Sequence, residues 1–176
     1  MKIVNIFANK LFSFHYDDQE DNEYDRLMDL WNDTEYVRSF LKENERDIPY
    51  GNTKISDLIK WIREDAISID DQLVTFVKSD GKELRTFFKP LVNSEYQFKV
   101  LSLQKGRRHY LRLYAIKVDE GTFVITGGAI KLHHLMEDRL HTQLELSKLK
   151  CAQDYLKKHG VFDCDSFFEY LSEQML

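Results

Sequence analysis

The chain contains few of the residues that form crosslinks and linkers. Its 176 residues include two cysteines, two prolines and seven glycines. Two cysteines, Cys151 and Cys164, are too few for a disulfide-stabilised scaffold, and we expect both to be free thiols. Little proline and glycine leaves little room for flexible linkers. We therefore expect a single domain over residues 1–176.

Long apolar runs are also missing. No stretch approaches the roughly 18 consecutive apolar residues of a membrane-spanning helix. Residues 1–5 lack the apolar segment of a secretory signal. We therefore expect a cytoplasmic protein without a membrane partner. Hydrophobic residues at 43% and charged residues at 31% are typical of a folded globular protein rather than a disordered one.

The net charge of −5 is unevenly distributed along the chain. Residues 82–158 contain 15 Lys and Arg against 8 Asp and Glu, a net of +7, and the remaining residues contain 10 against 22, a net of −12. Such asymmetry can mark a basic working surface beside an acidic scaffold. It is equally expected of a sheet that carries Lys and Arg on a solvated face.

The first part of the chain combines a short β segment with helices. Residues 3–7 and 11–16 predict one bent strand or a small hairpin. Asn22 and the pair at residues 32–33 are candidate helix caps, each followed by apolar residues at helical spacing. Residues 56–78 predict a longer helix whose apolar side chains share one face, with Gly81 beyond its end.

The middle of the chain predicts strands. Residues 96–100 and 110–117 alternate between apolar and polar side chains, and residues 105–109 form a basic loop between them. A second turn at residues 119–121 leads into an apolar strand that Gly127 and Gly128 end. We expect Leu111, Leu113 and Ala115 to face the core, and Tyr110, Arg112 and Tyr114 to face away from it.

The last part of the chain predicts two helices. The longer runs over residues 136–158 and is apolar on two sides, which indicates packing from two sides. The shorter runs over residues 165–173. The predicted fold is therefore α+β, with a small antiparallel sheet of about four strands, N-terminal helices packed on it and a long C-terminal helix.

The predicted sheet carries a set of side chains suited to phosphodiester chemistry. Metal-free cleavage of RNA needs a cation beside the phosphate, a base for the 2′-hydroxyl and an acid for the leaving oxygen. Arg suits phosphate geometry, and Tyr can stack on a base. The candidate RNA-binding residues are Lys105, Arg107, Arg108, His109 and Tyr114. The alternative is a solvated sheet face with long polar side chains.

Other sites find little support in the sequence. His134 and His141 are two helical turns apart, too far to share one metal ion without a further ligand between them, and we expect no metal site. His134 beside Lys131 is a candidate proton donor. Gly127 and Gly128 do not have the spacing of a phosphate-binding P-loop. We expect no small-molecule cofactor.

Three segments resemble the RelE/ParE superfamily of toxin–antitoxin toxins, especially its HigB-like branch. They are the Phe-Lys-Pro-Leu segment at residues 88–91, the Tyr-Leu-Arg-Leu-Tyr-Ala-Ile segment at residues 110–116, and the Phe-Val-Ile strand at residues 123–125 that leads to Lys131. The resemblance covers residues 11–158 and leaves a helical tail at residues 161–176. Where the family usually has a phenylalanine and paired lysines, this chain has Ala-Ile-Lys-Leu at residues 129–132.

The resemblance implies a RelE-like fold and a metal-independent mRNA endoribonuclease that acts on the ribosome and is neutralised by an antitoxin. By matching position, Arg112 would stabilise the phosphate in the transition state and Lys131 would supply charge or proton transfer. Tyr110 and His134 complete the candidate catalytic set. Two alternatives remain open: a non-catalytic interaction module on the same fold, and a ParE-type gyrase inhibitor.

Overall fold

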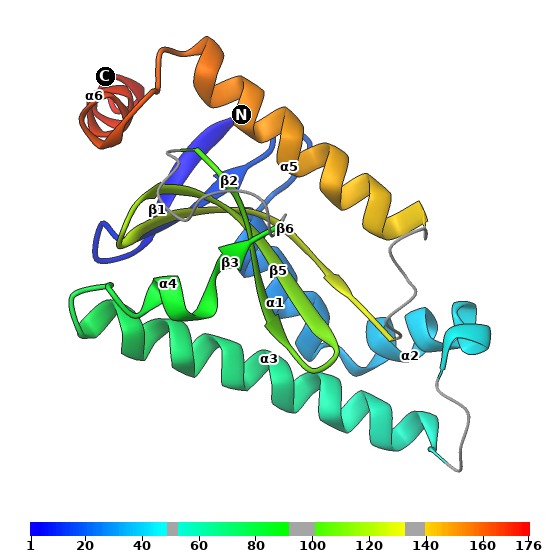
Figure 1. The fold of residues 1–176 in the computed structure, drawn as a ribbon. Helices are drawn as coiled ribbons and strands as arrows, with labels where there is room; N and C mark the ends of the chain where they lie inside the picture. Colours follow the sequence, from blue (N-terminus) through cyan, green and yellow to red (C-terminus); the bar gives the residue numbers. More distant parts are fainter. Residues whose placement is uncertain (49–52, 92–100, 133–139) are drawn as a thin grey trace.

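A six-stranded mixed sheet forms the middle layer of the molecule (Figure 1). The computed structural model describes residues 1–48, 53–91, 101–132 and 140–176. Across the sheet the strand order is β1-β2-β6-β5-β4-β3. The strands are β1 (Lys2–Phe7), β2 (Leu11–His15), β3 (Lys89–Pro90), β4 (Leu103–Arg108), β5 (Leu111–Asp119) and β6 (Thr122–Ile130).

Helices cover both faces of this sheet. The helices are α1 (Glu23–Asn32), α2 (Thr34–Glu43), α3 (Ile55–Lys78), α4 (Leu84–Phe87), α5 (Leu140–Lys158) and α6 (Cys164–Gln174), with a 3₁₀ turn at Glu45–Asp47. One hydrophobic core lies between the sheet and α1, α2 and α3, and a second lies between the sheet and α5 and α6. Figure 1 shows α3 and α5 on opposite sides of the strands.

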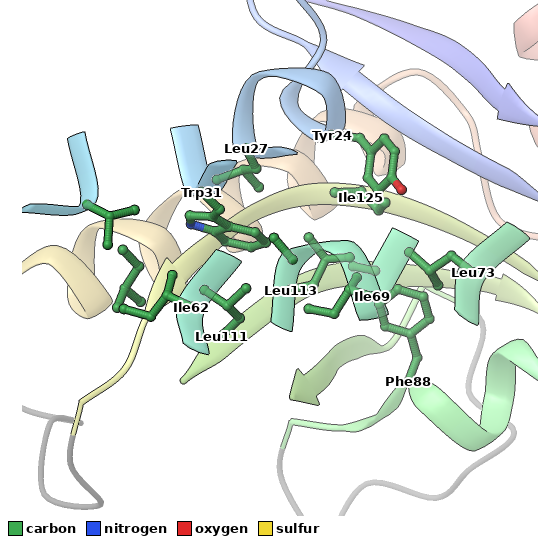
Figure 2. Close-up of a cluster of buried hydrophobic side chains, with 14 of the residues drawn as sticks. Tyr24, Leu27, Trp31, Ile62, Ile69, Leu73, Phe88, Leu111, Leu113 and Ile125 are labelled. Atoms are coloured by element: carbon green, nitrogen blue, oxygen red, sulfur yellow. The ribbon is translucent and has the colours of Figure 1, made fainter. Parts of the chain in front are cut away.

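The first core is built from side chains of the three N-terminal helices and the central strands. Figure 2 shows the side chains of α1 and α3 meeting those of β5 and β6. The labelled members are Tyr24, Leu27, Trp31, Ile62, Ile69, Leu73, Phe88, Leu111, Leu113 and Ile125. The residues that α3 contributes recur at helical spacing, as the sequence predicts, and burying them holds this helix along the sheet.

The prediction of about four antiparallel strands is wrong. The described residues form a sheet of six strands, and β2 runs parallel to β6, with Leu11 opposite Phe123 and Ser13 opposite Ile125. This pairing joins segments more than a hundred residues apart, and no local pattern encodes such a partner. β2 is also buried almost throughout, so it lacks the polar–apolar alternation of an edge strand.

The basic segment at residues 105–109 is not a loop. It forms most of β4, which pairs with β5 from Leu103 opposite Ile116 to Arg108 opposite Leu111. The turn lies at His109 and Tyr110 instead. The charged side chains of this strand masked its β character, because sequence patterns rely on apolar alternation. The strand predicted at residues 96–100 lies outside the described residues.

The second face of β5 is buried, contrary to the expectation that it faces away from the core. Leu111, Leu113 and Ala115 belong to the first core, while Tyr114 and Ile116 belong to the second. Helices α5 and α6 cover this face, which explains why β5 and β6 are buried along nearly their whole length. The amphipathic alternation of β5 therefore does not mark a solvated surface.

Several local predictions are confirmed. The side chain of Asn22 accepts hydrogen bonds from the first turn of α1, and that of Asp33 does the same for α2. Helix α3 ends at Lys78 and is followed by Gly81, whose φ of +74° suits glycine. The turn between β5 and β6 occupies Glu120 and Gly121, as expected.

Gly127 and Gly128 lie inside β6 rather than at its end. Their missing side chains leave room for side chains of α5 and α1 that lie close to the strand. A Cβ at Gly127 would lie 2.0 Å from Oε2 of Glu145, on α5. A Cβ at Gly128 would lie 2.8 Å from the ring of Trp31, on α1. The two glycines thus let helices approach the same strand from its two faces.

Helix α5 is held to the sheet and to α1 by buried charges. Oε2 of Glu145 accepts a hydrogen bond from the Gly128 N–H at 3.1 Å. Lys148 on α5 forms an ion pair with Glu23, whose side chain is fully buried and also binds Arg26 through two hydrogen bonds of 2.6 and 3.0 Å. Because these charges are paired and hydrogen-bonded, they fix the position of α5.

No helix among the described residues is both long and apolar enough to cross a membrane.

Candidate functional site

A cleft of about 460 Å³ opens where the turn between β4 and β5 meets α3. We call it the turn cleft; its lining residues are Trp61, Glu64, Asp65, Arg108, His109 and Tyr110. Three of these residues come from α3, one from the end of β4 and two from the turn. The cleft therefore depends on α3 packing along the sheet at a fixed angle, which the first hydrophobic core provides.

Asp65 is the anchor of the turn cleft. Only 5% of this residue is exposed, although it carries a carboxylate. Its Oδ1 lies 2.8 Å from Nδ1 of His109, and its Oδ2 accepts a hydrogen bond of 3.1 Å from the backbone N–H of Tyr110. A buried carboxylate is stable when it is satisfied in this way.

The contact with Asp65 determines which imidazole nitrogen of His109 carries the proton. A carboxylate only accepts hydrogen bonds, so Nδ1 must donate to it. In the neutral ring Nε2 is then an unprotonated acceptor. The side chain of His109 is 69% exposed, which leaves this ring open to a substrate. A histidine oriented by a carboxylate in this way is suited to accept and return a proton.

The turn that presents His109 has an unusual backbone. Only His109 and Tyr110 separate β4 from β5, and His109 has a φ of +21°. Two-residue hairpin turns commonly place glycine at positions with positive φ, because a side chain is disfavoured there. The two contacts with Asp65 hold the turn in this conformation, and such strained residues are frequent at functional sites.

Two aromatic rings form an apolar wall of the cleft. The rings of Trp61 and Tyr110 are nearly parallel, with an interplanar angle of 2° and a centroid distance of 6.4 Å. Trp61 is 41% exposed, which is high for a tryptophan on the inner half of a helix that packs on a sheet. Flat exposed aromatic faces of this kind are suited to stacking on a planar ligand.

The charges of the cleft are mixed. Nε of Arg108 lies 3.9 Å from Oδ1 of Asp65, beyond hydrogen-bond distance, and its side chain is 39% exposed. Glu64 adds a second carboxylate to the lining. The cleft combines one arginine, one imidazole and two carboxylates, so it is better equipped for proton transfer to a bound anion than for strong electrostatic attraction of one.

The structure divides the basic residues predicted from the sequence between the two faces of the sheet. Arg108, His109 and Tyr110 lie together in the turn cleft with Asp65. Lys105 is paired with Tyr114 and Arg107 with Arg112 across β4 and β5, on the face covered by α5. The predicted set therefore does not form one patch.

Arg112 forms hydrogen bonds with the backbone at the turn between β4 and β5. The residue is 9% exposed, and its Nη1 donates hydrogen bonds to the carbonyl oxygens of His109 at 2.9 Å and Leu111 at 2.8 Å. Burial, together with the neighbouring charge of Arg107, lowers the pKa of Arg112 below its ordinary value. Arg112 therefore stabilises the backbone conformation of His109.

Neither Lys131 nor Tyr114 lines the turn cleft. Lys131 follows β6, and its backbone N–H donates to the carbonyl oxygen of Tyr110 at 2.6 Å. Tyr114 is 3% exposed and belongs to the second core. His134 lies outside the described residues. Within the described ranges, no group of three or more His, Cys, Asp or Glu side chains is placed to hold a metal ion.

Sequence reasoning missed Asp65. A signal for Asp65 is present in the sequence, since it follows Leu58 by seven residues and precedes Ile69 by four, which places an acidic residue inside the apolar stripe of α3. Acidic residues are rarely buried without a partner. The identity of that partner, 44 residues away, has no local signal.

Comparisons of the chain with protein-family models, with curated proteins and with solved structures found no match. The functional argument therefore depends on the chemistry of the turn cleft.

Proposed function

We propose that the protein is a metal-independent endoribonuclease of the toxin–antitoxin kind, which cleaves mRNA in the turn cleft. One observation carries the proposal: His109, oriented by the buried Asp65, faces an open cleft beside an arginine and two parallel aromatic rings. This set meets the three requirements of RNA transesterification, namely a proton acceptor, a cation and a surface that holds a base.

In the proposed reaction Nε2 of His109 removes the proton from a ribose 2′-hydroxyl. The 2′-oxygen attacks the adjacent phosphorus, and the bond from phosphorus to the 5′-oxygen breaks. Arg108 offsets the charge that develops on the phosphate, and the Tyr110 hydroxyl gives the leaving 5′-oxygen its proton. The products are a 2′,3′-cyclic phosphate and a 5′-hydroxyl; Tyr110 regains its proton from solvent, and the His109 imidazolium releases its proton to solvent.

Asp65 and Arg112 act as positioning residues in this scheme. Asp65 stabilises the imidazolium that forms when Nε2 takes the proton, because its carboxylate stays hydrogen-bonded to Nδ1. Arg112 fixes the carbonyl oxygen of His109 and thereby the direction of the turn. This role for Arg112 differs from the direct contact with phosphate that the family resemblance implies.

The cellular setting belongs to the same proposal. We infer action in the cytoplasm on ribosome-bound mRNA, with neutralisation by an antitoxin protein. An antitoxin that covers the turn cleft would shield the exposed ring of His109 and the exposed face of Trp61 together. The mixed charge of the cleft fits a substrate that is delivered by the ribosome better than free RNA captured by charge alone.

Induced expression in a bacterial host tests the proposal. We expect the wild-type chain to arrest growth and to produce mRNA fragments with 5′-hydroxyl ends, and His109→Ala to be harmless at equal protein level. Lys82→Gln is the matched control, since Lys82 is exposed, pairs with the exposed Asp80 and does not line the turn cleft. Harmless expression of the folded wild-type protein, or equal toxicity of His109→Ala, would refute the nuclease assignment.

A non-catalytic interaction module is the second candidate, and the position of Arg112 favours it. This arginine is buried and donates to main-chain oxygens of its own hairpin, so it does not reach a substrate phosphate. A module of this kind would bind RNA or a protein at the turn cleft without cleaving it. Growth arrest without RNA fragments in the same experiment would favour this candidate.

A further inference from the structure

A second cavity lies beside α4 and β3, the edge strand of the sheet. Its volume is about 210 Å³. Among the described residues, its lining includes three cationic side chains and one carboxylate: Arg85, Lys89, Lys117 and Glu120. We call it the Lys117 pocket. It shares no lining residue with the turn cleft, and an inference about it does not depend on the nuclease proposal.

The carboxylate of Glu120 sits between two of these cations. Its Oε1 lies 3.1 Å from Nζ of Lys117, and its Oε2 lies 3.2 Å from Nη1 of Arg85. The hydrogen bond from Lys117 is the largest of the causes that lower the pKa of Glu120, so the group is an anion at neutral pH. The third cation, Lys89, donates to the backbone carbonyl of Arg85 at 3.1 Å.

The pocket is built around a buried ammonium group. The Lys117 side chain is only 7% exposed, whereas those of Glu120 and Arg85 are 47% and 58% exposed. Gln104, another buried polar residue, and the stacked rings of Phe88 and Phe123 complete the walls. A lysine is seldom buried without an anion nearby. Here Glu120, in the turn between β5 and β6, supplies an anion beside Lys117.

The ion pair of Glu120 with Arg85 is weak enough to be exchanged. Glu120 lies in the turn between β5 and β6, and its pair with Arg85 is exposed, a type of contact that contributes about 0.2–1 kcal/mol. An external anion that contacts both cations would release the carboxylate to solvent at a small cost. The size of the pocket, below the roughly 300 Å³ of a typical small-molecule site, restricts that anion to a small group.

We propose that the Lys117 pocket binds a phosphate monoester group, with Lys117 and Arg85 as its cationic ligands and Glu120 as the internal anion that it displaces. Arginine offers a planar pair of donors that matches phosphate oxygens, and the lysine ammonium adds a compact positive charge.

Titration of the full-length protein with inorganic phosphate tests the proposal. The buffer is phosphate-free at constant ionic strength, and the backbone ¹H–¹⁵N signal of Gly121, beside Glu120, reports binding. Glu120→Gln should tighten phosphate binding by roughly three- to tenfold, because the internal competitor loses its charge. Arg85→Gln and Lys117→Met should weaken it, and Lys82→Gln, outside the pocket, should leave it unchanged.

The direction of the Glu120→Gln effect decides the question. A purely structural ion pair predicts that this variant binds phosphate no better than the wild type, and that result would overturn the proposal. Binding that is equal in Arg85→Gln and the wild type would overturn it as well. Since Arg85 is exposed, Arg85→Gln tests the pocket even if Lys117→Met does not fold. None of these results depends on RNA cleavage.

Discussion

His109 and Asp65 are joined by a contact of 2.8 Å between Nδ1 and Oδ1, although they lie 44 residues apart and on different elements. The contact links the middle of α3 to a two-residue hairpin turn. It does three things at once: it satisfies a buried carboxylate, selects the tautomer of an exposed imidazole and stabilises a turn with positive φ. The chemistry of the turn cleft follows from this pair.

Replacing Trp61 by alanine should separate binding from stability. We expect the free energy of unfolding to fall by roughly 1 kcal/mol, because the lost contact is a partly exposed ring pair with Tyr110. Affinity for single-stranded RNA should fall by about 1–3 kcal/mol, the value of one stacked base. Fluorescence anisotropy with a labelled oligoribonucleotide measures the affinity, and urea unfolding measures the stability.

The matched control for this change is Tyr36→Ala, which removes a partly exposed aromatic ring of α2 that does not line the turn cleft. It should leave RNA affinity unchanged. Equal losses of affinity in the two variants would show that Trp61 has no special place in binding.

The backbone at His109 should favour glycine. His109→Gly and His109→Ala both remove the hydrogen bond to Asp65, so their difference isolates the effect of the φ of +21°. We expect the glycine variant to be more stable than the alanine variant by about 0.5–1 kcal/mol, since glycine adopts positive φ without a steric penalty. At Arg107, which lies inside β4, the alanine variant should instead be more stable than the glycine variant. A more stable alanine variant at His109 would contradict the strained turn.

Gly127→Ala should destabilise the attachment of α5. The new Cβ would lie 2.0 Å from Oε2 of Glu145 and would displace that carboxylate from the Gly128 N–H. We expect a loss of about 1–3 kcal/mol in the free energy of unfolding, measured by chemical denaturation. In the Glu145→Ala background the same change should cost less, because the clashing atom is gone. Strictly additive losses would show that the two residues do not interact.

Glu145 should make stability depend on pH in a defined direction. Burial, aided by Glu23 and opposed by Lys148, raises the pKa of Glu145 above its ordinary value of 4.5. The folded state therefore holds this proton more tightly than the unfolded state does. The contribution of Glu145 to stability is complete below pH 4.5 and is lost as pH rises through the folded-state pKa.

Glu145→Gln tests this dependence, because glutamine keeps an acceptor for the Gly128 N–H and does not titrate. The free energy of unfolding of the variant, relative to that of the wild type, should increase as pH rises above 4.5. Urea unfolding at a series of pH values measures the difference. A difference that is constant, or that decreases with pH, would contradict the assignment.

Helices α1, α2 and α3 were predictable from the sequence because their signals are local. Asn22 and Asp33 cap α1 and α2 through hydrogen bonds to residues two or three positions away. The apolar residues of α3 recur at helical spacing, which identifies the buried face of this helix from its own sequence. Each of these features is decided within a few residues, where periodicity and capping preferences act.

The sheet and the cleft were harder to predict because they are decided at a distance. The parallel partner of β2 is β6, and the partner of Asp65 is His109. Neither pairing can be inferred from the residues next to these positions in the sequence. The basic residues of β4 were grouped from the sequence in one RNA-binding set, but alternate side chains of a strand point to opposite faces. Arg107 and Arg108 are therefore separated by the sheet, although they are adjacent in the chain.

The cleavage of a translated reporter mRNA by the purified protein tests the central claim most directly. In a translation extract we expect the wild type and Lys82→Gln to cut the mRNA and leave 2′,3′-cyclic phosphate ends. Asp65→Asn should cut about 10²–10⁴-fold more slowly, because the amide no longer fixes the tautomer or stabilises the imidazolium of His109. An intact mRNA with the wild type, or equal cleavage by Asp65→Asn, would contradict a catalytic role for the turn cleft.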